Sequence, residues 1–266
     1  MKKLKQFTLV SVVFGGLFFL FGSEVVPENF QPQEILDIAA NSDVIIIFNS
    51  GGWGDTPFEK AEDFAPIVEE IQKTLNSYGY DSIVIPYQRT KNTLPGKIAS
   101  AKDFLNFFNF SSDTLAKDLE FLAESLPDKK IILAGLSAGG ALVEETMAKI
   151  SDYNPPTTSF HSSLRSEWAP EAQVYAVAVG IPFWQKTIES ENTLLLDNSG
   201  KDTLSAGEIK SLISALVKVP FKWISAKING DDLTFSQALQ APGHDYLWDS
   251  PEVGFQIVTF LENKIR

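Results

Sequence analysis

The sequence contains no cysteine, and this absence removes several kinds of chemistry at once. A disulfide framework, a thiolate zinc site and a cysteine nucleophile are all excluded. Histidine is also scarce, since His161 and His244 are the two in 266 residues. Any catalysis that needs an imidazole base therefore depends on one of these two residues.

Positive charge is in short supply as well. Lysine and arginine number 22 against 34 aspartate and glutamate residues, which gives a formal net charge of -12 at pH 7. A chain with that balance repels the phosphates of nucleic acids. We therefore expect no nucleic-acid partner.

The first residues carry lysine but no acid. Lys2, Lys3 and Lys5 precede an uncharged apolar run at 7–22, FTLVSVVFGGLFFLFG. This order is typical of a signal peptide, although no A-x-A-like cleavage triplet follows. The run is shorter than the about 20 residues of a membrane span. Residues 1–22 are interpreted as a cleaved signal peptide or an uncleaved membrane anchor, with a buried helix as the third possibility. We expect an exported protein, either secreted or periplasmic, or held at the membrane by its N-terminus.

The remainder is interpreted as a leader, 23–42, and one α/β domain, 43–266. Strand-like apolar runs alternate with helix-like segments along this domain, an order that favours a mostly parallel sheet with helices on both faces. No internal repeat is visible. The expected strands are 43–49, 82–87, 129–137, 174–181 and 193–197, with a tentative one at 233–241.

Helix boundaries are predicted from capping residues. Residues 88–110 are expected to be irregular, and their phenylalanine-rich part, 104–110, to belong to the core rather than to an acyl pocket. The amphipathic segment 208–228 is interpreted as a helix packed on the sheet, with a lid or lipid-facing element as the alternative. The predicted helices are 56–77, opened by Thr56-Pro57-x-Glu59; one from Ser111 or Ser112 to about Leu126; 137–150; and a last one from Asp249 or Ser250.

The most specific motif is Gly135-Leu136-Ser137-Ala138-Gly139, a G-x-S-x-G pattern between a predicted strand and a predicted helix. A nucleophilic serine needs such a sharp turn, because its hydroxyl must stand clear of the sheet. Glycine two positions away on either side relieves the crowding of the strained backbone. The following helix N-terminus favours developing negative charge. Ser137 is the predicted nucleophile, and a glycine-rich turn without a catalytic role is the alternative.

A nucleophilic serine needs a base. His244 lies just before the last predicted helix, whereas His161 lies in the polar, proline-containing stretch 151–172. The chain order Ser, acid, His with a late histidine matches one known arrangement of serine hydrolases. His244 is therefore the predicted general base, and His161 is interpreted as a loop residue.

The acid that orients the histidine is expected after a strand and before His244. Asp202 and Asp197 both meet that requirement. Asp202 is preferred because it lies at the tip of a loop, whereas Asp197 ends the predicted strand and suits a turn. Asp231 and Asp232 are weaker candidates beside Gly230.

An oxyanion hole needs two backbone donors. One is expected from Ala138, the residue after the nucleophile, and the other from the loop after an earlier strand. The glycine-rich stretch 50–54 occupies that place, and Gly52 or Gly51 is the predicted donor. A tight turn without a catalytic role is the alternative.

On the glycine-rich loop 50–54, the elbow 135–139, the acid at 202 or 197 and the late His244, the chain resembles the α/β-hydrolase superfamily from about residue 43 to its end. The resemblance implies a Ser-His-Asp triad and hydrolysis through an acyl-enzyme, without a metal or an organic cofactor. The favoured substrate is a carboxylic ester, including esters of lipids or other apolar acyl chains. A peptidase or amidase on the same triad and a non-catalytic binding protein on the same fold are the alternatives. Association with a membrane would involve residues 7–22.

Overall fold

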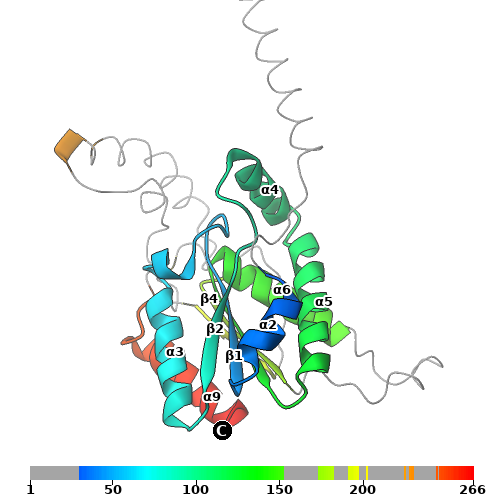
Figure 1. The fold of residues 1–266 in the computed structure, drawn as a ribbon. Helices are drawn as coiled ribbons and strands as arrows, with labels where there is room; N and C mark the ends of the chain where they lie inside the picture. The colour runs from blue at the N-terminus through cyan, green and yellow to red at the C-terminus, as the bar shows by residue number, and fades with distance from the viewer. Residues whose placement is uncertain are drawn as a thin grey trace, which may run out of the picture.

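The computed structural model describes residues 30–152, 173–182, 191–197, 202, 225, 228–230, 244 and 246–266. Its centre is a five-stranded parallel sheet in the order β2-β1-β3-β4-β5 (Figure 1). The strands are β1 (Val44–Asn49), β2 (Ser82–Tyr87), β3 (Lys130–Leu136), β4 (Val174–Val179) and β5 (Thr193–Leu196). All five lie where the sequence predicts them, and the tentative strand 233–241 lies outside the described residues.

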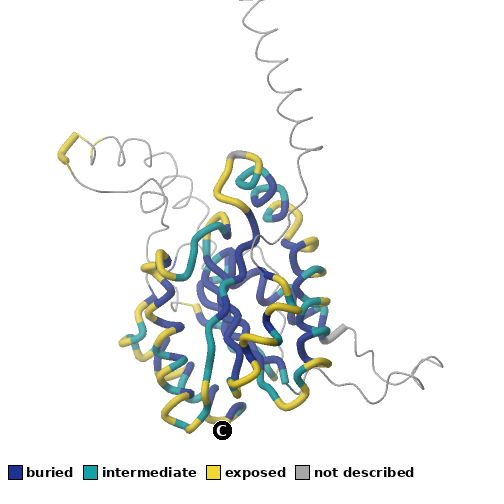
Figure 2. Tube along the Cα trace, viewed as in Figure 1, coloured by how far each residue is buried: buried dark blue, intermediate teal, exposed yellow. Residues whose placement is uncertain are grey.

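Helices cover both faces of the sheet, as predicted. One face packs against α2 (Pro32–Ala39), α5 (Asn109–Ser125) and α6 (Ala138–Asp152), and the other against α3 (Ala65–Ser77) and α9 (Gln256–Lys264). Successive side chains of a strand point to opposite faces of the sheet. Because helices cover both faces, the central strands are apolar on both sides. Figure 2 shows the resulting buried centre. Full burial of each isoleucine or leucine contributes about 2 kcal/mol.

The register brings the carboxyl ends of the central strands to one edge. Asn49 at the end of β1 is paired with Gly135, and Gly135 with Ala178 of β4. The loops that follow β1, β3 and β4 therefore meet at the same edge of the sheet. In parallel α/β sheets this edge is where ligands bind.

The predicted helix 56–77 begins later than expected, although its end at Ser77 is confirmed. Phe58–Lys60 form a short 3-10 turn, and α3 starts at Ala65. Pro66 explains the difference, because its ring clashes with the carbonyl four residues earlier and its nitrogen carries no hydrogen. A helix can therefore hold Pro66 in its first turn but cannot run through it.

The prediction that residues 88–110 are irregular is wrong, because they contain the helix α4 (Leu94–Leu105). The hydroxyl of Thr93 accepts a hydrogen bond from Gly96 N at 3.2 Å, and a proline follows in the first turn. These helix-start signals were present in the sequence. The predicted caps of α5 are also wrong, since Phe108 occupies the N-cap position and Ser111 and Ser112 lie in the first turn.

The leader 23–42 contains α2, whose Ile35 and Ala39 are buried in the core. At the other end of the chain Ser250 is the N-cap of a π-helical turn, Pro251–Phe255, that leads into α9. The segments 153–172 and 208–224 lie outside the described residues. Within the described part of the chain, no helix is long and apolar enough to cross a membrane.

Candidate active site

Ser137 occupies a strained turn between β3 and α6. Its φ is 55°, in the left-handed region that residues other than glycine rarely adopt. Such a conformation costs about 1–2 kcal/mol and is held only where the surroundings impose it. Here Ser137 N donates a hydrogen bond to Val179 O at 2.7 Å, which fixes the turn against β4. The serine is half-buried.

The glycines of the elbow have no room for side chains. A Cβ at Gly135 would overlap Gly139 O, and a Cβ at Gly139 would overlap Asn49 O. A Cβ at Gly140 would lie 3.0 Å from Val179 O. Glycine at these positions lets α6 approach β1, β3 and β4 closely, as the motif predicts.

The first amides of α6 are available to a negative charge. Ala141 N makes the bond to Ser137 O at 2.9 Å, so the amides of Ala138, Gly139 and Gly140 precede the first intrahelical bond. Such N–H groups, together with the helix dipole, favour an anion. Ala138 N, the predicted oxyanion donor, is one of them.

The glycine-rich loop lies beside the serine. A Cβ built on Gly51 would be 3.2 Å from Leu136 O and 3.6 Å from the Cβ of Ser137. Gly54 N donates to Gly51 O at 3.1 Å and closes a tight turn. Among the described residues, the amides of Gly51, Gly52 and Trp53 make no hydrogen bond to a protein group. These N–H groups are therefore available to a substrate oxygen.

Buried side chains that the sequence analysis did not single out hold this loop by its carbonyl groups. Arg89 Nη2 donates to Gly52 O at 3.0 Å. The hydroxyls of Thr90 and Ser100 both donate to Trp53 O, at 3.0 and 2.7 Å. In a trans peptide the N–H points opposite to the C=O. Fixing the carbonyl of Gly52 thus also fixes the direction of the Trp53 amide.

Arg89 is a buried cation with an exposed fraction of 1%. Its guanidinium stacks 4.8 Å from the centre of the Phe108 ring, and a Cβ at Gly54 would overlap its Nε. Within the described part of the chain, Nε and Nη1 have no hydrogen-bond partner. Burial lowers the pKa of Arg89, and the nearby carboxylate of Asp103 opposes this shift. These two buried nitrogens thus lack acceptors among the described residues, which costs free energy of folding.

Asp202 and His244 form a buried pair. His244 Nδ1 lies 2.7 Å from Asp202 Oδ2, and Asp202 is 1% exposed. Tyr246, which the sequence analysis missed, donates its hydroxyl to the same oxygen at 2.6 Å. Asp197, the alternative acid, is exposed at the end of β5. His161, Asp231 and Asp232 lie outside the described residues.

The end of β4 joins this pair to the serine elbow. Val179 O accepts from Ser137 N, and the next residue, Gly180, lies against the imidazole. A Cβ at Gly180 would lie 2.6 Å from His244 Cε1 and 2.7 Å from Tyr246 Cε2. Ser137 and His244 thus contact adjacent residues of one strand end.

A small pocket opens beside the imidazole. Leu136, His244 and Trp248 contribute to its wall, and Asp63 lies at its exposed rim. Desolvation by the surrounding protein raises the pKa of the Asp63 carboxyl, and hydrogen bonds from backbone N–H groups oppose this shift. The described residues contain no group of three or more histidine or acidic side chains that could hold a metal ion.

The five-stranded parallel sheet with this serine elbow has the architecture of an α/β-hydrolase fold. No family model matches the sequence, and no curated protein is similar to it. Among solved structures, the chain is similar to cutinase from Trichoderma reesei in complex with a C11Y4 phosphonate inhibitor, at 17% identity and a TM-score of 0.42. That match covers 66% of this chain and 73% of the cutinase.

Proposed function

We propose that the protein is a serine hydrolase that cleaves a carboxylic ester through an acyl-enzyme. Ser137 is the nucleophile, His244 the general base and Asp202 the acid that orients the imidazole. The observation that carries the proposal is the Asp202–His244 pair lying against Gly180, one residue from the backbone group that fixes Ser137. A strained serine and a buried imidazole–carboxylate pair at one sheet edge are the parts that acyl transfer needs.

In the first step the hydroxyl oxygen of Ser137 attacks the ester carbonyl and its proton passes to His244 Nε2. The carbonyl π electrons move onto oxygen, and the amides of Ala138 and of Gly51 or Gly52 stabilise the resulting oxyanion. Collapse of this intermediate breaks the bond to the alcohol oxygen, which takes the proton from His244. Water then attacks the acyl-enzyme, again with His244 as base, and releases the acid and Ser137.

Asp202 acts through the imidazole. Its carboxylate accepts a hydrogen bond from Nδ1–H, which leaves Nε2 without a hydrogen and able to receive the serine proton. Tyr246 donates to the same carboxylate oxygen and holds it in this orientation. No metal or organic cofactor enters the proposed steps.

The favoured substrate is an ester with an apolar acyl chain. The pocket beside His244 supports this choice, because Pro66, Ile67, Leu136, Leu247 and Trp248 contribute to its lining. Acidic residues at its rim disfavour an anionic substrate group at that point.

A fluorophosphonate probe tests the proposal directly. Ser137 Oγ would attack phosphorus and fluoride would leave, so intact mass should increase by the phosphonyl group less one hydrogen. Ser137→Ala should not react, whereas Ser112→Ala, a buried serine on α5, should react like the unchanged chain. Failure of the unchanged, folded protein to react with the probe or to hydrolyse p-nitrophenyl esters would contradict the proposal.

Matched p-nitrophenyl esters and p-nitroanilides of one acyl chain separate esterase from amidase activity. We expect turnover of the esters and little of the anilides. Export is also proposed, from residues 1–22, and sequencing the N-terminus of the mature protein distinguishes cleavage from anchoring.

A further inference from the structure

The turn between α4 and α5 exposes large apolar side chains. Leu105, Phe107 and Phe110 have exposed fractions of 65%, 53% and 47%. The sequence predicts 104–110 as core, and for these three residues that prediction is wrong. We refer to residues 105–110 as the aromatic turn. Clustered exposed apolar residues of this kind mark interaction sites more often than isolated ones do.

The backbone of the aromatic turn is built to separate neighbouring phenylalanines. Phe107 and Phe108 are both left-handed, with φ of 54° and 56°, a conformation that bulky residues rarely adopt. As a result Phe108 enters the core over Arg89, while Phe107 points to solvent. Glycine or asparagine would adopt this left-handed conformation at lower cost, so two phenylalanines here indicate that their side chains are needed for interactions.

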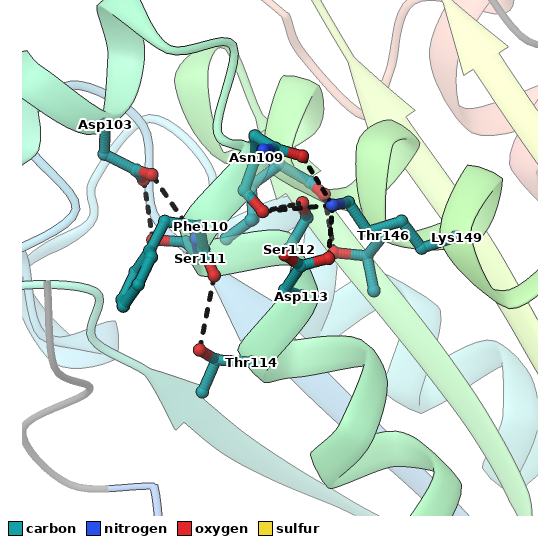
Figure 3. A network of polar contacts seen from close by, with 10 residues as sticks. Asp103, Asn109, Phe110, Ser111, Ser112, Asp113, Thr114, Thr146 and Lys149 are labelled. Atoms are coloured by element: carbon teal, nitrogen blue, oxygen red, sulfur yellow. Dashed lines mark hydrogen bonds and ion pairs between the residues drawn. The ribbon is translucent and has the colours of Figure 1, made fainter.

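A polar network holds the aromatic turn to the body of the protein (Figure 3). The carboxylate of Asp103 accepts from Ser111 N at 3.3 Å and from Ser111 Oγ at 2.6 Å. Lys149 of α6 donates to Asn109 O and Oδ1, at 3.0 and 2.7 Å, and also pairs with Asp113. The ring of Phe110 points away from the Lys149 cluster in Figure 3. These contacts fix the backbone of the turn to α4 and α6, so its exposed apolar side chains are held in place.

The segment that leads into the turn is basic, although the chain is acidic. Lys91, Lys97 and Lys102 lie between residues 88 and 112, and the acid in that interval, Asp103, is buried. The chain as a whole carries a net charge of -12. An anionic surface would attract this face and repel the rest of the molecule, so the charges favour one orientation.

The described chain also begins at this side of the sheet. Phe30 packs edge-on against Tyr87, with ring centroids 5.1 Å apart, two residues before Arg89. Seven residues, 23–29, separate the apolar run 7–22 from Phe30 in the sequence. Seven extended residues span at most about 25 Å. If that run enters a bilayer, the connecting chain keeps this edge of the protein close to it.

We propose that the aromatic turn docks on a lipid bilayer with anionic headgroups. Leu105, Phe107 and Phe110 enter the boundary between headgroups and acyl chains, where aromatic rings are favoured. Lys97 and Lys102 face the headgroup phosphates. The hydroxyl of Ser100 on α4 binds Trp53 O, so docking would hold the glycine-rich loop near the lipid surface. The proposal does not depend on the hydrolase activity.

The absence of cysteine gives a clean test with one label per molecule. Phe107→Cys in the full chain, coupled to an environment-sensitive fluorophore such as NBD, reports on the aromatic turn. Ile38→Cys is the matched control, because Ile38 is also an exposed apolar residue, at 56%. It lies near the opposite edge of the sheet, where Ala40 O accepts from Lys129.

With vesicles of phosphatidylcholine and phosphatidylglycerol, the label at 107 should shift to the blue and be quenched several-fold more strongly by lipids brominated in the acyl chain than the label at 38. Charge reversal at Lys97 and Lys102 should weaken the dependence on phosphatidylglycerol. Equal quenching at both positions, or a label at 107 that stays in water on vesicle-bound protein, would overturn the proposal. A blue shift that grows with protein concentration without vesicles would also overturn it and assign the turn to contacts between copies.

Discussion

Gly180 and His244 are in contact at a point where a single methyl group would not fit. A Cβ at residue 180 would lie 2.6 Å from His244 Cε1, and the φ of Gly180 is 62°. The loop after β4 therefore sets the position of the imidazole as directly as its hydrogen bond to Asp202 does. Because of this contact, the proposed chemistry requires a glycine at position 180, far from His244 in the sequence.

Gly180→Ala is expected to lower kcat/KM on a p-nitrophenyl ester by about 100-fold, because small displacements of a catalytic group have effects of that size. Gly79→Ala is the matched control. Gly79 also has a positive φ, of 89°, but a Cβ there meets nothing within 4 Å. Both variants lose some stability through the positive φ, and Gly180→Ala should melt lower because its methyl group also displaces His244 and Tyr246, so activity is compared at a temperature at which both variants are folded. Equal activity in the two variants would show that contact with His244 is unimportant.

Asp202→Asn should lower kcat by about 10³–10⁴-fold, since an amide at this position favours the wrong imidazole tautomer. Asp197→Asn, at the exposed end of β5, should leave kcat within about twofold, because surface substitutions away from the site have little effect. Ester turnover under saturating substrate measures both. A larger loss in the Asp197 variant would assign the acid to that residue instead.

Tyr246→Phe tests the second hydrogen bond to the Asp202 carboxylate. Its loss should lower kcat by roughly 10-fold, in line with about 1.5 kcal/mol for a hydrogen bond to a charged group. The ring and its packing against Gly180 are preserved, so the melting temperature should fall by only a few degrees, through the lost hydrogen bond to the buried carboxylate. If the double variant with Asp202→Asn loses no more than Asp202→Asn alone, the two groups act as one unit.

Arg89 is expected to act as a positioning residue for the glycine-rich loop. Arg89→Met removes the bond to Gly52 O but fills much of the same volume, and kcat should fall by about 10–100-fold while KM changes little. Arg89→Lys should restore part of kcat, because an ammonium can also donate to that carbonyl. A rise in KM with unchanged kcat would instead place the loop in substrate binding. The rate of labelling by the fluorophosphonate should follow kcat in both variants.

The elbow and the strands could be predicted because their signals are local. A β-branched run and glycines at fixed spacing act within a few residues of Ser137. The Arg89 clamp could not be predicted in this way, because Arg89 and Gly52 are 37 residues apart and an arginine after a strand carries no mark of burial. The exposed Phe107 was mispredicted for a similar reason. Phenylalanine is usually buried, so the sequence predicts both rings in the core. The left-handed backbone at Phe107 and Phe108 decides which of the two rings is buried.

Asp118 on α5 should make stability depend on pH in an unusual direction. Burial raises its pKa to about 6, above the ordinary value of 3.8. Because the folded state then holds the proton more tightly than the unfolded chain, ionising Asp118 costs stability: this penalty is absent below pH 4 and grows as the pH rises through 6. Asp118→Asn removes this penalty, so the melting temperature at pH 7 should rise by a few degrees while at pH 4 it changes little. Glu124→Gln, an exposed residue on the same helix, is the control for the loss of one negative charge. Melting curves of the three proteins between pH 4 and 8 measure the difference, and a gain at pH 7 no larger than that of Glu124→Gln would rule out a buried carboxylate as its source.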